Sequence, residues 1–84
     1  MIKNSFDLKK DILVKDLRTR IMGGDYAHGE KLPVEVVLAG KLNVSRDTLR
    51  EALKILEAEG LLVRIRSKGT FVNLPSAGNG KKIL

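Results

Sequence analysis

The chain has 84 residues, which is long enough for one domain and too short for two. Because 43% of the residues are hydrophobic and only 4% are aromatic, we expect an aliphatic core. It has no cysteine, no signal-peptide core and no apolar run of the roughly 18 residues that span a bilayer, which excludes disulfide scaffolds, thiolate chemistry and membrane spans, so we expect a cytoplasmic protein. The formal net charge is +6, and five basic but no acidic residues follow Glu59, which favours a polyanionic partner.

The first predicted element is a helix from Phe6 to Met22. Asn4 or Ser5 is suited to cap its start, and the Gly23-Gly24 pair is suited to end it. Its apolar residues recur at helical spacing and form one stripe: Phe6, Leu13, Val14, Leu17 and Ile21. We expect this stripe to face the core.

A second helix is predicted from Val34 to Leu42. The stretch from Asp25 to Lys31 before it is turn-like, and Leu32 can form a short extended step. Pro33 keeps the residue before it out of helical geometry, as the entrance to a helix requires.

A third helix follows the short break at Asn43-Val44, with Ser45 as its N-cap and Gly60 as the glycine beyond its end. Its core-facing residues repeat at helical spacing: Leu49, Ala52, Leu53 and Leu56. Because two short helices are joined so closely, we predict a helix-turn-helix at about residues 35–54.

The last predicted element is a β-hairpin with a basic tip at about residues 62–74. Apolar and basic residues alternate from Leu62 to Arg66, Ser67-Lys68-Gly69 forms a turn, and an extended run continues from Thr70 to Leu74. The predicted fold is therefore α+β: a winged helix-turn-helix of three helices followed by a two-stranded β-hairpin wing. Residues 76–84 have the composition of a flexible tail or linker.

The start of the third helix carries residues suited to DNA recognition. A recognition helix enters the major groove by its N-terminal end, where free backbone N–H groups favour phosphate. Arg46 and Arg50 lie one turn apart there, and arginine can read guanine with two parallel hydrogen bonds, while Ser45 or Thr48 could offer a hydroxyl to phosphate. Taken alone, the segment also fits an ordinary capped surface helix with solvated arginines.

The hairpin adds a second basic surface. Arg64 and Arg66 share one face of its first strand, and Lys68 lies at its tip. A basic wing can lie along the DNA backbone or enter the minor groove, where counterion release supplies affinity. The alternative is an edge strand that carries charge to prevent aggregation. The helix-turn-helix and the basic wing together favour nucleic acid.

Three segments of the chain, in order and at the expected separations, match the signature of the GntR family of bacterial regulators. They are LPVEVVLA at residues 32–39, VSRDTLREALKILEAEGL at residues 44–61 and KGTFV at residues 68–72. The chain therefore resembles the DNA-binding head of this family over about residues 8–75.

This resemblance implies a head that binds double-stranded DNA in sequence-dependent fashion, as part of a homodimeric repressor that reads a palindromic operator. A small-molecule effector would act through a C-terminal domain that this chain lacks, and we expect the chain to be an excised head. The family's DNA-contacting positions match seven residues, four on the recognition helix and three at the wing tip: Ser45, Arg46, Thr48, Arg50, Arg66, Ser67 and Lys68.

The chain departs from the family pattern at three places. The family usually has a serine cap after the helix-two proline and a basic residue nearby, where this chain has Val34, Val36 and Val37. Loss of such a cap costs about 1 kcal/mol. His28 replaces a loop proline, and Ser67 replaces the wing-tip glycine, so we expect the wing to sit slightly further from DNA.

Two other functional classes are considered. A winged helix used as a protein-interaction module predicts that Arg46 and Arg50 are held in intramolecular salt bridges, and that Leu8 and Ile12 form part of the contact surface. An enzyme would need a convergent set of nucleophile, base or metal ligands, and the sequence offers none. His28, the single histidine, is interpreted as a solvated loop residue, and no cofactor or metal is expected.

Overall fold

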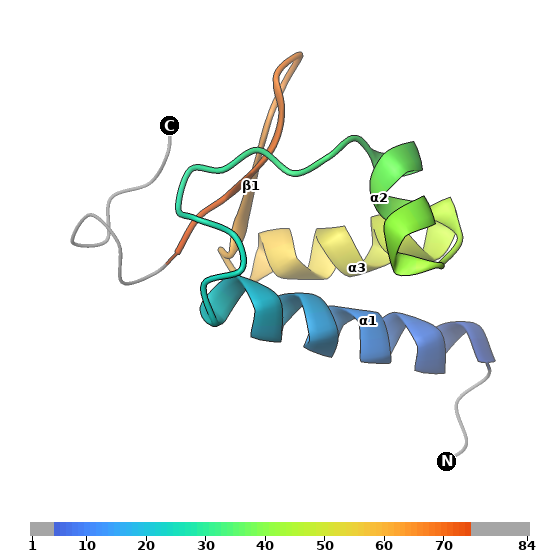
Figure 1. The fold of residues 1–84 in the computed structure, drawn as a ribbon. Helices are drawn as coiled ribbons and strands as arrows, with labels where there is room; N and C mark the ends of the chain where they lie inside the picture. The colour runs from blue at the N-terminus through green and yellow to red at the C-terminus, as the bar shows by residue number, and fades with distance from the viewer. Residues whose placement is uncertain (1–4, 75–84) are drawn as a thin grey trace.

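The computed structural model describes residues 5–74, with side chains from residue 8 onward. It contains three helices and a two-stranded antiparallel sheet (Figure 1): α1 (Ser5–Met22), α2 (Glu35–Leu42), α3 (Arg46–Ala58), β1 (Leu62–Ile65) and β2 (Gly69–Val72). This order confirms the predicted fold class. The possible cap Asn4 and the predicted tail lie outside the described residues. No helix in the described part is long and apolar enough to cross a membrane.

The core forms between α1 and α3, which lie side by side below α2 and the hairpin (Figure 1). The apolar stripes predicted on both helices are buried from Leu13 onward: Leu13, Val14, Leu17, Ile21, Leu49, Ala52, Leu53 and Leu56. Burial of each leucine side chain stabilises the fold by roughly 2 kcal/mol relative to exposure. Leu38 of α2 and Val72 of β2 close the same cluster, so the hairpin is packed onto the helices.

The end of α3 directs the chain into the hairpin. Gly60 has φ = +83°, a left-handed conformation that glycine adopts without strain. Its N–H donates to the Glu57 carbonyl at 3.0 Å, and the Leu61 N–H donates to the Leu56 carbonyl at 3.0 Å. Leu61 is consequently buried, and β1 begins directly against the core.

The hairpin pairs Leu62 with Val72 and Ile65 with Gly69, so both strands are shorter than predicted. Beyond the strand ends, the Asn73 N–H donates to the Leu61 carbonyl at 2.9 Å, which extends the same register by one residue. On its other edge, β2 receives the loop before α2, because Lys31 forms a bridge with Phe71. The loop after α1 therefore lies along the wing, a pairing that the sequence pattern did not predict (Figure 1).

The start of α2 lacks a side-chain cap, as the sequence predicted. Val34 has the extended geometry of an N-cap residue, φ = −60° and ψ = 155°, and its carbonyl accepts from the Leu38 N–H at 2.9 Å. Its side chain forms no capping hydrogen bond. Asn43 ends α2 in the left-handed conformation with φ = 56° and turns the chain into α3.

Candidate nucleic-acid interface

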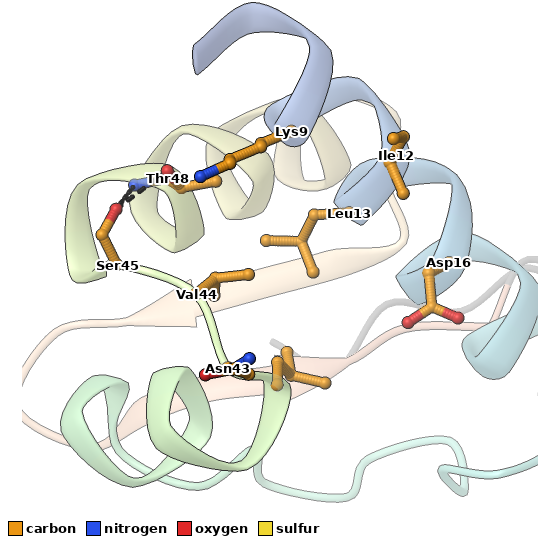
Figure 2. A pocket seen from close by; sticks show the side chains of 9 residues that line it. Lys9, Ile12, Leu13, Asp16, Asn43, Val44, Ser45 and Thr48 are labelled. Atoms are coloured by element: carbon orange, nitrogen blue, oxygen red, sulfur yellow. Dashed lines mark hydrogen bonds between the residues drawn. The ribbon is translucent and has the colours of Figure 1, made fainter. Parts of the chain in front are cut away.

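Ser45 fixes the N-terminal end of α3. Its hydroxyl oxygen accepts from the Thr48 N–H at 3.1 Å and donates to Thr48 Oγ1 at 2.8 Å (Figure 2). This arrangement is an N-cap, which satisfies one of the free N–H groups of the first turn. Ser45 remains exposed, whereas Thr48 is only 4% exposed. Both hydroxyl groups were predicted to be available to phosphate. In the structure Ser45 is accessible, whereas Thr48 is buried and its hydroxyl accepts from Ser45 within the cap.

Arg46 and Arg50 project from the start of α3 beside Glu35, the first residue of α2. Arg50 Nε donates to Glu35 Oε1 at 2.9 Å, and Arg46 Nη2 lies 3.8 Å from the same oxygen. Arg64 of β1 reaches the second Glu35 oxygen at 4.0 Å. We call these four residues the Glu35 cluster. The hydrogen bond and charge of Glu35 raise the pKa of Arg50, which therefore stays protonated.

The wing tip presents the remaining three predicted residues. Arg66, Ser67 and Lys68 are all exposed in the turn between β1 and β2. Ser67 has φ = 66°, so the position where the family has glycine does adopt a glycine-like conformation here. The Lys68 N–H donates to the Ile65 carbonyl at 3.0 Å and closes the turn.

A hollow of about 620 Å³ joins these two parts of the predicted site, and we call it the basic hollow. It lies between the start of α2, α3 and the wing. Its charged lining comprises five cations and one anion: Lys31, Arg46, Arg64, Arg66, Lys68 and Glu35. The structure therefore brings Arg46 together with the wing tip, and Arg50 reaches its edge through Glu35.

Sequence analysis missed two cations and two apolar residues of the basic hollow. Arg64 was placed on the wing but not in the site, and Lys31 was assigned to a turn. The bridge to Phe71 carries Lys31 beside the wing, and no local pattern marks such a distant pairing. Val34 and Val36 also line the hollow, although they were noted only as departures from the family pattern.

The protein-interaction alternative predicted two features that are present. Arg46 and Arg50 are in salt bridges, and both Leu8 and Ile12 are exposed. However, the two arginine side chains are 53% and 45% exposed, and exposed ion pairs contribute at most about 1 kcal/mol. These pairs are weak enough for phosphate oxygens to replace Glu35, so they do not remove the arginines from binding.

A second hollow, of about 680 Å³, lies between α1 and the turn that joins α2 to α3 (Figure 2). Ile12 and Val44 contribute apolar groups to it, and its two charged lining residues, Lys9 and Asp16, have opposite signs. It lacks the concentration of cations found in the basic hollow, so its charge does not favour a polyanion.

His28 has a structural partner, in contrast to the solvated side chain that the sequence predicted. Its Nδ1 accepts from the Leu74 N–H at 3.1 Å, which ties the loop after α1 to the end of the wing. Within residues 5–74, no three His, Cys, Asp or Glu side chains lie close enough together to hold a metal ion.

Comparison with known proteins gives a family and several relatives. The family model described as bacterial regulatory proteins, gntR family, matches residues 9–72. The chain is 44% identical over 64 residues to the HTH-type transcriptional regulator GmuR of Bacillus subtilis, covering 76% of this chain and 27% of that protein. It is 40% identical over 63 residues to the arabinose metabolism transcriptional repressor of Geobacillus stearothermophilus, covering 75% and 17%. The chain thus spans only a minor part of these relatives.

Solved structures share the fold. The DNA-binding domain of AraR in complex with operator ORR3 superimposes with a TM-score of 0.69 and 33% identity, over 76% of this chain and 77% of that one. A GntR family transcriptional regulator from Listeria monocytogenes gives a TM-score of 0.71 and 30% identity, over 86% and 62%.

Proposed function

The chain belongs to the GntR family of bacterial regulatory proteins, and from this membership and its basic surface we propose that it is the winged helix-turn-helix DNA-binding domain of a transcriptional regulator. The basic hollow carries the proposal, because it unites the start of α3 with the wing tip on one cationic face. The start of a recognition helix and an adjacent basic wing are the two parts with which such a domain holds duplex DNA.

Each predicted site residue has a proposed role. Arg46 and Arg50 reach base edges in the major groove, where arginine favours guanine. Ser45 binds phosphate beside the free N–H groups of α3, and Thr48 acts indirectly by holding the Ser45 hydroxyl.

The wing tip supplies affinity with little base preference. Arg66 and Lys68 neutralise phosphates, and the left-handed Ser67 brings the turn close to the minor groove. Because Ser67 carries a side chain, we propose that this wing sits slightly further from DNA than one with glycine at that position.

The rest of the regulator is proposed from the relatives, several of which are named as repressors. We propose that the DNA-binding domain spans residues 8–75, and that residues 76–84 lead to an effector-binding domain. Two such heads in a homodimer would read the two halves of a palindromic operator and repress transcription in the cytoplasm.

The test is selection of bound duplexes from a random DNA library with the 84-residue chain, followed by titration of the recovered duplex at two salt concentrations. We expect one short motif to be enriched, with an affinity that falls as salt rises. Recovery of no motif, with salt-sensitive binding to every duplex, would contradict sequence reading and leave a merely basic surface.

A further inference from the structure

Three valines are exposed around the start of α2 although nothing in the core requires them there. Val34 is 62% exposed, Val36 61% and Val37 47%. Val34 gives α2 no side-chain cap, so a polar residue at this position would serve the helix better. The start of α2 therefore presents apolar surface with no structural role within the described fold.

Two of these valines face the cations, and the third does not line the same surface. Val34 and Val36 line the basic hollow together with Arg46 and Arg64, whereas Val37 is absent from its lining. An apolar patch surrounded by arginines and lysines suits a partner that is an anion overall but offers an apolar group at one point. Duplex DNA has this character, because each thymine displays its C5 methyl group in the major groove.

Glu35 connects this patch to the recognition arginines. Glu35 lies between Val34 and Val36 in the chain, and its carboxylate lies 2.9 Å from Arg50 and 3.8 Å from Arg46. Val36 and Arg46 also line the same basic hollow, so the two side chains border one surface. A base edge within reach of Val36 is a close neighbour of those within reach of Arg46 and Arg50.

We propose that Val36, with Val34 beside it, is a specificity-determining residue that contacts the C5 methyl of a thymine next to the base pairs read by Arg46 and Arg50. This inference rests on the proposed DNA-binding function. It assigns a thymine preference to the α2 side of the half-site, where a basic residue would favour guanine or phosphate instead.

The test replaces each thymine of the selected duplex in turn by deoxyuridine, which removes only the C5 methyl group. Titration of the 84-residue chain is expected to show about fourfold weaker binding at one thymine, the effect of exposing one methyl group. Val36→Ala is expected to weaken binding to the original duplex by a similar factor. The affinity of this variant is expected to be the same with and without the deoxyuridine replacement. Val37→Ala, the matched control on the same helix, is expected to behave like the parent chain.

Two results would overturn the inference in distinguishable ways. If the chain binds its selected duplex but Val36→Ala keeps the same response to deoxyuridine at every position, Val36 reads no methyl group and the proposed function stands. If the parent chain selects no duplex at all, both the proposed function and this inference fail.

Discussion

At the scale of single residues, one carboxylate organises the cations of the basic hollow. Glu35 lies within 4.0 Å of Arg46, Arg50 and Arg64, which come from α3 and β1. Two further carboxylates lie beside them, because Glu57 is 3.7 Å from Arg64 and Asp47 is 3.9 Å from Arg50, and together these charges lower the mutual repulsion of the arginines. The arginines are therefore held near one another in the free protein, and Lys31, Arg66 and Lys68 add positive charge to the basic hollow.

Arg46→Ala is expected to weaken binding to the selected duplex by roughly 1–3 kcal/mol and to relax the preference at one base pair, because a bidentate contact is lost. Lys68→Ala is expected to weaken binding to every duplex and to flatten its salt dependence, since a phosphate contact is lost. Titrations on selected and unrelated duplexes at two salt concentrations separate the two effects. If Arg46→Ala leaves the affinity and base preference intact, α3 is not the recognition helix.

Glu35→Gln is expected to change the free energy of unfolding by less than about 1 kcal/mol, because its arginine partners are exposed to solvent. Urea denaturation followed by circular dichroism measures this change. A loss of several kcal/mol would mean that the arginines are structural ties, as the protein-interaction alternative requires.

At the scale of elements, the two helices of the helix-turn-helix begin differently. Ser45 caps α3 through the Thr48 N–H, whereas Val34 leaves the start of α2 without a side-chain acceptor. The backbone of Val34 already has N-cap geometry, so only its side chain is unsuitable. The stability of α2 therefore rests on its buried face, through Leu38 and Ala39, and on its backbone bonds.

Val34→Ser is expected to raise the free energy of unfolding by about 1 kcal/mol, since the hydroxyl can accept from a free N–H of the first turn. Val37→Ser, an equally conservative change one turn inside the helix, offers no such cap and serves as the control. Denaturant unfolding of both variants checks the difference, and equal stabilities would contradict the account of α2.

Ser45→Ala is expected to lower the free energy of unfolding by about 1 kcal/mol through loss of the α3 cap. Ser45→Asp keeps a cap acceptor but places a negative charge where phosphate is proposed to bind. We therefore expect the aspartate variant to fold as stably as the parent and to lose DNA affinity. An aspartate variant that binds DNA normally would remove Ser45 from the proposed interface.

At the scale of the whole molecule, an ion pair joins the two long helices at the end opposite the start of α3. Arg18 of α1 donates to Glu59, the C-cap residue of α3, at 2.9 and 2.5 Å. The hydrogen bond and charge of Arg18 hold the pKa of Glu59 below its ordinary value of 4.5. A lowered carboxyl pKa stabilises the fold above that ordinary value, and the contribution disappears as the pH falls through the lowered pKa.

The urea concentration at the unfolding midpoint of the parent chain is therefore expected to decrease as the pH is lowered from neutral to about pH 3. Glu59→Gln is expected to reduce that decrease. Glu51→Gln is the matched control, because Glu51 pairs locally with Lys54 at 3.4 Å on the same helix. The expected difference is small, since both members of the Arg18 pair are partly exposed. An equal pH dependence in all three proteins would show that this pair contributes nothing.

Much of the molecule could be predicted from the sequence because it depends on local signals. The buried faces of α1 and α3, the Ser45 cap and the left-handed Gly60 follow from spacing and residue type within one element. Pairing of Lys31 with Phe71, the inward position of Thr48 and the approach of Arg64 to Glu35 could not be predicted, because each depends on how separate segments pack in three dimensions.

We propose that the basic hollow, with the start of α3 and the wing tip, is the DNA-binding face. The most direct test is an NMR titration of the isotope-labelled 84-residue chain with its selected duplex, following backbone amide shifts. We expect shifts to concentrate at the start of α2, the first turns of α3 and the wing tip, while the exposed face of α1 around Leu8 and Ile12 stays unchanged. Shifts that cluster on that face of α1, with the wing unaffected, would contradict it.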